Sequence, residues 1–220
     1  MIIRTILDTD LYKFTTSYAY IKLFPYAIGT FSFKDRDGTE YSDEFVERLR
    51  TEISQLSHVA LTEKELEYMI KNCRFLPRVY WEWLSSFRFQ PEKIEIRLDE
   101  NRQLHIEVND YLYKATLYEV PLLAIVSEIK NQSSGNVANL EDILYKLSEK
   151  TELSNKHQLL FSEFGTRRRF SFDVQNQVIG HLKQTAHYCI GTSNCHFAMK
   201  YGMKPCLLYT SPSPRDPKTS

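Results

Sequence analysis

Several features that mark membrane, secreted or nucleic-acid-binding proteins are missing from this chain. No apolar run approaches the roughly 20 residues that span a bilayer, and the amino terminus lacks the long apolar segment of a signal peptide. The 28 basic and 28 acidic side chains cancel, so no overall field attracts a nucleic acid or an anionic membrane. We therefore expect a cytoplasmic protein without a nucleic-acid or membrane partner.

Cysteine patterns for metal binding are also absent. The cysteines form no C-x-x-C pair, and no group of cysteine and histidine has the spacing of a zinc site. The sequence predicts free thiols in a reducing compartment and no metal ligands. The four cysteines are Cys73, Cys189, Cys195 and Cys206.

Two nucleotide-binding motifs are missing as well. The chain contains neither G-x-x-x-x-G-K-[ST] nor G-x-G-x-x-G. The first absence excludes use of ATP through a P-loop, and the second excludes a Rossmann dinucleotide site.

The most informative segment that is present reads Phe-Gly-Thr-Arg-Arg-Arg over residues 164–169. It follows an apolar run and precedes an amphipathic stretch, an order that predicts a strand, a glycine turn, a cationic loop and a helix. Three guanidiniums at the carboxyl end of a strand, beside a helix amino terminus, suit a bound phosphate. The segment predicts an enzyme with a phosphorylated substrate. The alternative is stacking of the arginines and phenylalanines on single-stranded nucleic acid, which the neutral net charge disfavours.

The residues before this segment mix strand and helix signals. Alternating apolar residues predict a strand over 28–34 and a hairpin of 94–98 with 104–108. Helical spacing predicts further elements. They are a helix over 43–56, one capped by Thr62 and Glu65, one opened by Pro77, and one over 120–129 with Pro121 in its first turn. A hinge is expected at 133–136.

From residue 159 onward the pattern changes to two strand–helix units. The expected strands cover 159–164 and 186–190, and the expected helices cover 171–184 and 193–201. Gly165 and Gly191 stand at matching places after the two strands. This is the pattern that begins an α/β barrel, which keeps its active site at the carboxyl ends of its strands. A complete barrel needs about 250 residues, and only two units fit here.

The last 15 residues, 206–220, differ from everything before them. They are polar and contain three of the eight prolines, a composition that supports neither a helix nor a central strand. Residues 206–216 also look like translated sequencing-adapter text. We expect a non-native tail; the alternative is a genuine disordered tail.

Four segments in register resemble the nicotinate phosphoribosyltransferase family. They begin at Asp8 (Asp-Thr-Asp-Leu-Tyr-Lys-Phe), Tyr118 (Tyr-Glu-Val-Pro-Leu-Leu-Ala), Phe164 and Gly191 (Gly-Thr-Ser-Asn). The resemblance runs from about residue 6 to residue 205. It implies an α/β fold, with an amino-terminal α+β domain over 1–135 and the first, truncated units of an irregular α/β barrel over 136–205.

The resemblance also implies a reaction and an assembly. Family members join nicotinate to phosphoribosyl pyrophosphate in NAD biosynthesis, act as homodimers and form each active site at the dimer interface. Tyr12 from one subunit and Phe164 from the other are then expected to sandwich the pyridine ring. Ser193 and Asn194 are expected to face the nicotinate carboxylate, to which a hydroxyl and an amide can donate. The alternative role of Ser193 is to cap the following helix.

The phosphate contacts implied by the resemblance come from basic residues. Arg167 is expected to hold the ribose 5-phosphate, helped by Lys13 and Arg36. For Arg36 a plain charged strand end is an equal alternative. Consecutive side chains cannot all face one ligand, so Arg168 and Arg169 stay open between ligand contact and pairing with a carboxylate.

Family chemistry further uses Mg²⁺ and couples ATP hydrolysis, as a ligase, through a transiently phosphorylated histidine. Ser211 stands where that histidine is expected. We therefore expect the parent enzyme to be a nicotinate phosphoribosyltransferase and the 220-residue chain itself to be an inactive fragment. The alternatives are a truncated product without activity, or a relative specific for nicotinamide.

Overall fold

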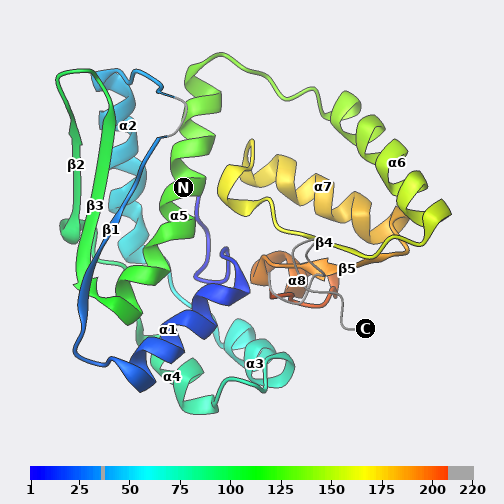
Figure 1. Cartoon of the computed structure of the whole chain (residues 1–220), viewed down its shortest axis with the longest axis horizontal. Helices are drawn as coiled ribbons and strands as arrows, with labels where there is room; N and C mark the ends of the chain where they lie inside the picture. Colours follow the sequence, from blue (N-terminus) through cyan, green and yellow to red (C-terminus); the bar gives the residue numbers. More distant parts are fainter. Residues whose placement is uncertain (36–37, 208–220) are drawn as a thin grey trace, which may run out of the picture.

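The computed structural model describes residues 1–35 and 38–207. In Figure 1 a sheet with its covering helices lies beside a smaller group of helices and short strands from the later part of the chain. No helix in the described ranges is both long enough and apolar enough to cross a membrane.

The sheet consists of three antiparallel strands in the order β1-β3-β2. Strand β3 lies in the centre and its alternate residues Leu104, Ile106 and Val108 are buried, as the alternation in the sequence predicts. The hairpin of β2 with β3 is confirmed, and β1 pairs with the other edge of β3. The strands are β1 (Ile28–Ser32), β2 (Ile94–Leu98) and β3 (Leu104–Tyr111).

Local capping signals mark where two of the helices around this sheet begin. Ser42 accepts a hydrogen bond from the backbone of Phe45 at the start of α2, and Thr62 with Glu65 forms the predicted capping box of α3. Pro77 precedes α4, as predicted. The helices are α1 (Leu11–Leu23), α2 (Asp43–Ser54), α3 (Glu63–Asn72), α4 (Arg78–Ser86) and α5 (Leu112–Ser133).

Helix α5 differs from its prediction. It begins at Leu112, so Pro121 lies in its middle and not in its first turn. A proline inside a helix removes a backbone hydrogen bond at a cost of about 3 kcal/mol. Apolar side chains on both sides of it, among them Tyr118, Leu122 and Ile125, are fully or almost fully buried. Burial of this helix in the core offsets the cost, and a local pattern does not report that burial.

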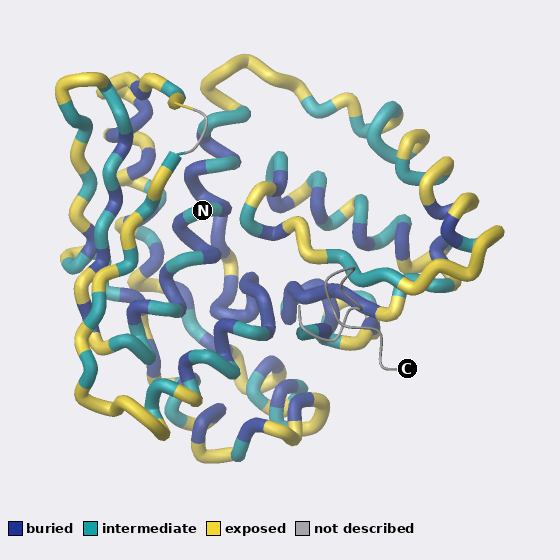
Figure 2. Tube along the Cα trace, in the orientation of Figure 1, coloured by how far each residue is buried: buried dark blue, intermediate teal, exposed yellow. Residues whose placement is uncertain are grey.

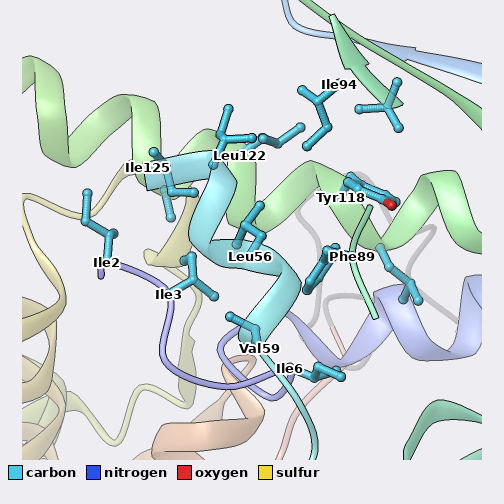
Figure 3. Close-up of a cluster of buried hydrophobic side chains, with 14 of the residues drawn as sticks. Ile2, Ile3, Ile6, Leu56, Val59, Phe89, Ile94, Tyr118, Leu122 and Ile125 are labelled. Carbon is cyan, nitrogen blue, oxygen red and sulfur yellow. The ribbon is translucent and has the colours of Figure 1, made fainter. Parts of the chain in front are cut away.

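The core around α5 includes the amino-terminal segment. Figure 3 shows Ile2, Ile3 and Ile6 in one hydrophobic cluster with Val59, Leu122 and Ile125, and Ile6 lies next to Val59. Figure 2 shows most of the same segment as buried, between the two parts of the molecule. The isoleucines at 2, 3 and 6 and Leu7 are therefore part of the core.

The later part of the chain contains the two expected strand–helix units. Strands β4 and β5 pair in parallel, as predicted for the start of a barrel. Strand β4 is shorter than predicted because Gln158, in the left-handed conformation, ends the preceding helix and the Leu159 N–H still bonds back to Ser154. The elements are α6 (Leu140–His157), β4 (Phe161–Glu163), α7 (Phe172–Thr185), β5 (Cys189–Thr192) and α8 (Cys195–Tyr201).

Residues 204–206 occupy the next parallel position beside β5. Thr192 donates its N–H to the Lys204 carbonyl and accepts from the Cys206 N–H, at 3.2 and 2.9 Å. A Cβ on Gly191 would come within 2.0 Å of the Lys204 carbonyl oxygen, so this approach requires glycine. Cys206, the first residue of the predicted tail, is thus packed against β5. The rest of that tail from residue 208 onward lies outside the described residues.

Backbone hydrogen bonds join the amino-terminal segment to the second strand–helix unit. The Leu11 N–H donates to the Ser193 carbonyl at 2.8 Å, and the Cys195 N–H donates to Thr9 at 3.1 Å. Beside them, Arg169 forms a bidentate ion pair with Asp8 at 2.7 and 3.0 Å. The side chains of Arg169 and Asp8 are 1% and 0% exposed, so the ion pair is buried between the two parts of the molecule.

We predict that Arg169→Ala lowers the free energy of unfolding by about 3–5 kcal/mol, because it leaves the Asp8 carboxylate buried without its counter-charge. Urea denaturation followed by tryptophan fluorescence measures this. Arg78→Ala is the matched control, since Arg78 pairs with Glu82 on the surface and should cost below about 1 kcal/mol. If the two variants lost equal free energy of unfolding, the buried pair would not stabilise the fold more than a surface pair does.

Candidate functional site

A cluster of charged side chains lies where the amino terminus of α1 meets the turn after β4. Lys13 and Arg167, both predicted to bind phosphate, share the carboxylate of Glu119 from α5. Arg167 also approaches Asp10, with 3.3 Å between Nε and Oδ2. The structure therefore brings together two of the predicted basic residues, and it surrounds them with two carboxylates that the prediction did not include.

The three consecutive arginines do not face one ligand. Arg169 is buried against Asp8, with Glu128 at 3.8 Å, and Arg168 is exposed. Only Arg167, with about a third of its side chain exposed, lies in the cluster with Lys13. This agrees with the expectation that consecutive side chains cannot all face one ligand, and of the two roles left open for Arg169 the structure shows pairing with a carboxylate. The separation of the arginines also weighs against a basic surface for nucleic acid.

Tyr12 lies on the same cluster. Its hydroxyl donates to Glu119 at 3.2 Å, and its ring lies 4.7 Å from the Lys13 ammonium. Phe164 follows β4 and is 55% exposed. Among the described residues no ring contact joins Tyr12 to Phe164. A sandwich of a ligand ring by these two side chains therefore stays a prediction, and so does the contribution of a second subunit to it.

Ser193 is held by Asp10. Its hydroxyl donates to Asp10 Oδ1 at 2.7 Å, while its backbone N–H donates to the Glu163 carbonyl at 2.9 Å. Burial raises the pKa of Asp10 above its ordinary value, against the opposing effects of the Ser193 hydrogen bond and the nearby Arg167 charge. A protonated Asp10 would donate to Ser193 and leave the serine O–H free for an anionic ligand. The hydroxyl's availability thus depends on the protonation of its neighbour.

Asn194 has a different role from the predicted ligand contact. Its amide nitrogen donates to Asp8 at 2.9 Å and to Thr166 at 3.0 Å, and its oxygen accepts from the Phe197 backbone at 3.0 Å. Both N–H groups are used inside the protein and the side chain is fully buried. Asn194, and not Ser193, is therefore the N-cap of α8. The predicted contact of Asn194 with a nicotinate carboxylate is not supported by this geometry.

Two residues of the cluster, Asp10 and Glu119, were not singled out from the sequence. Asp10 lies two positions before Tyr12, in the segment that begins at Asp8. Glu119 follows Tyr118, in the second of the four segments. A carboxylate in such a segment is the available signal for a counter-charge to Lys13 and Arg167. The pairing itself depends on the distance between α1, α5 and the turn after β4, which the sequence does not report.

The remaining predicted residues cannot be placed. Arg36 and Ser211 lie outside the described residues. Among residues 1–35 and 38–207 no group of three or more His, Cys, Asp or Glu side chains gathers in a way that could hold a metal ion. The four cysteines are free, as predicted.

Comparisons with known proteins agree with one another. A family model described as the nicotinate phosphoribosyltransferase N-terminal domain matches residues 7–127, and a second model for the same family matches residues 159–210. A nicotinate phosphoribosyltransferase from Methanosarcina acetivorans is 40% identical over 219 residues, covering 92% of this chain and 54% of the relative.

Solved structures give the same result. A nicotinate phosphoribosyltransferase from Porphyromonas gingivalis superposes with a TM-score of 0.92 at 42% identity, over 94% of this chain and 53% of the other. A putative nicotinate phosphoribosyltransferase from Saccharomyces cerevisiae gives 0.86 at 30% identity, over 93% and 54%. The chain thus spans about half the length of the relatives that it matches.

The raised pKa of Asp10 predicts a specific pH dependence of stability. A raised folded-state pKa means that the folded chain binds this proton more tightly than the unfolded chain does. The contribution of Asp10 is then full below its unfolded pKa of about 3.9 and declines as pH rises through the folded value. We expect Asp10→Asn to become progressively more stable than the parent as pH rises from about 4 to 7.

Urea denaturation at a series of pH values tests this expectation. Glu65→Gln is the control of opposite sign, because hydrogen bonds from His196, Thr5 and Thr62 outweigh burial and lower the pKa of Glu65. Its stabilising contribution is present above the unfolded pKa and is lost as pH falls. Parallel curves for the parent and Asp10→Asn would show that the Asp10 proton is not linked to folding.

Proposed function

Because the chain belongs to the nicotinate phosphoribosyltransferase family, we propose that it forms part of an enzyme that joins nicotinate to phosphoribosyl pyrophosphate. The products are nicotinate mononucleotide, for NAD biosynthesis, and pyrophosphate. The observation that supports this most directly is the convergence of Lys13 and Arg167 beside Tyr12, at the carboxyl end of β4. This is the edge at which α/β barrels carry their active sites.

Arg167 and Lys13 are the proposed phosphate ligands. The planar guanidinium of Arg167 matches two phosphate oxygens, and Lys13 adds a second positive charge. Arg167 is about a third exposed, so its guanidinium can be reached. In the reaction these groups would hold the ribose 5-phosphate while the bond to pyrophosphate breaks. Rate then comes from holding the ribose in place and from fixed charges.

Tyr12 and Phe164 are the proposed clamp for the pyridine ring. Offset stacking on two aromatic faces holds a flat ring with few polar contacts. The exposed position of Phe164 leaves its face open for such a contact. The family resemblance further supports a homodimer in which each ring comes from a different subunit.

Ser193 is the proposed contact for the nicotinate carboxylate. Its hydroxyl can donate to an anion when Asp10 carries a proton, and the buried position of Asp10 favours that form. A carboxylate ligand beside Asp10 would favour it further, because two neighbouring negative charges repel. The side chain at position 193 thereby selects the acid over its amide.

Two further parts of the proposal rest on the family alone. Mg²⁺ would neutralise the departing pyrophosphate, and coupled ATP hydrolysis would drive the reaction, in the manner of a ligase that is itself transiently phosphorylated. We assign the activity to the complete enzyme and propose that the 220-residue chain alone is inactive.

A chimera tests the assignment. We expect residues 1–205 joined to the remaining half of a full-length relative to form nicotinate mononucleotide, and the 220-residue chain alone to form none. Arg167→Ala in the chimera should lower kcat/KM roughly a hundredfold through loss of the phosphate contact. Arg168→Ala, which removes an exposed neighbouring arginine, is the matched control. Formation of nicotinate mononucleotide by the unmodified 220-residue chain, measured by chromatography, would refute its proposed inactivity.

Base selection is tested at position 193. Ser193→Asp places a second carboxylate against Asp10, where one of the two must take up a proton. We expect nicotinate use by the chimera to fall at least tenfold, as a desolvated like-charge contact costs more than 1.4 kcal/mol. The Ser193→Ala variant separates the effect of losing the hydroxyl from the effect of adding a charge. We expect its use of nicotinate to fall less than that of Ser193→Asp. Unchanged nicotinate kinetics in Ser193→Asp would dismiss Ser193 as the carboxylate contact.

A further inference from the structure

The carboxylate of Glu119 is the point at which three predicted ligand-binding side chains meet. One oxygen accepts from Tyr12 at 3.2 Å and lies 3.5 Å from an Arg167 nitrogen, and the other accepts from the Lys13 ammonium. We propose that Glu119 is a positioning residue that gathers these side chains and stands in for the substrate phosphate until the phosphate binds. This inference rests on the phosphate role proposed above for Lys13 and Arg167.

The elements involved explain why Glu119 can gather the three side chains. Tyr12 and Lys13 are neighbours in the first turn of α1, while Arg167 comes from the turn after β4. Helix α5 packs against both of these elements and presents Glu119 between them. One carboxylate thus bridges residues that are more than 150 positions apart in the chain. Removal of its charge affects both sides of the site together.

A count of charges indicates that phosphate and Glu119 compete. Lys13 and Arg167 supply two positive charges, and Asp10 and Glu119 supply two negative charges. The cluster therefore offers no net attraction to an anion while both carboxylates are ionised and in contact. A protonated Asp10 leaves the two cations with Glu119 as their one ionised carboxylate, and a phosphate group gains both cations fully only if Glu119 withdraws.

Of the two carboxylates, Glu119 is the one able to withdraw. Asp10 is fully buried, its backbone pairs with Asn194, and it accepts the Ser193 hydroxyl. Glu119 is about a quarter exposed and has a longer side chain that can rotate toward solvent. The carboxylate oxygens on Lys13 and Arg167 hold the places that phosphate oxygens would take.

Lys13 reports on this arrangement. Burial lowers the pKa of Lys13, whereas the hydrogen bond and charge of Glu119 raise it; Arg167 lowers it and Asp10 raises it. Besides these groups, Tyr12 and Thr116 contact the ammonium. Loss of the Glu119 charge should therefore lower the pKa of Lys13 further. This readout depends only on the cluster and needs no substrate.

The experiment compares the parent chain with Glu119→Gln, which keeps the shape and a hydrogen-bond acceptor but removes the charge. The pKa of Lys13 is measured from the pH dependence of its ¹³Cε resonance, assigned with Lys13→Arg. Binding of inorganic phosphate is measured by calorimetry at low ionic strength. We expect a lower Lys13 pKa and roughly three- to tenfold tighter phosphate binding in Glu119→Gln.

Two controls separate the site from general charge effects. Glu82→Gln removes an exposed carboxylate that pairs with Arg78, and should change neither readout. Arg167→Ala should abolish the gain in phosphate affinity, which locates the binding at this cluster. If Glu119→Gln does not fold, Glu119→Asp replaces it; its shorter side chain loosens both contacts, and we expect changes in the same directions but smaller.

The possible results decide between the proposals. A lower Lys13 pKa with tighter phosphate binding supports the inference. A lower Lys13 pKa with unchanged or weaker phosphate binding overturns the stand-in role and leaves a structural ion pair. An unchanged Lys13 pKa overturns the positioning role. Phosphate binding that is insensitive to Arg167→Ala counts against the proposed phosphate role of Arg167, independently of the result for Lys13.

Discussion

The buried ion pair of Asp8 with Arg169 is the constraint on which the rest of this structure depends. Two charges removed from water are tolerated only when each is matched by a partner and by further hydrogen bonds. Asp8 has Arg169 and Asn194, and Arg169 also donates to the Ile2 carbonyl and to Gln175. These contacts fix the amino-terminal segment against the turns after both strands of the incipient barrel.

The candidate site is built on this junction. Two residues after Asp8, Asp10 contacts Ser193 and Arg167, and the first turn of α1 then places Tyr12 and Lys13 beside Glu119. The same short stretch of chain therefore joins the two parts of the molecule and carries residues of the candidate site. A displacement of the Asp8–Arg169 pair would move the residues of the candidate site with it. The stability of this region and the geometry of the candidate site are therefore coupled.

The distribution of charge in the site follows from burial. Arg169 is buried and pairs with carboxylates, so its role is structural. Arg167 is partly exposed, so its N–H groups can be reached by a ligand. Burial raises the pKa of Asp10, against the opposing effects of the Ser193 hydrogen bond and the Arg167 charge. Neighbouring residues of the same type thus differ in role because they differ in access to water.

The sequence by itself determined the elements whose signals are local. Alternation set the β2–β3 hairpin, the Thr62–Glu65 capping box set the start of α3, and four motifs in register identified the family. Only the tertiary structure decided that α5 continues through Pro121, that Arg167 and not Arg169 faces the site, and that Asn194 caps a helix. These outcomes depend on burial and on distances between segments far apart in the chain. No local pattern carries that information, because the free energy of burying a side chain is set by neighbours that arrive only when the chain folds.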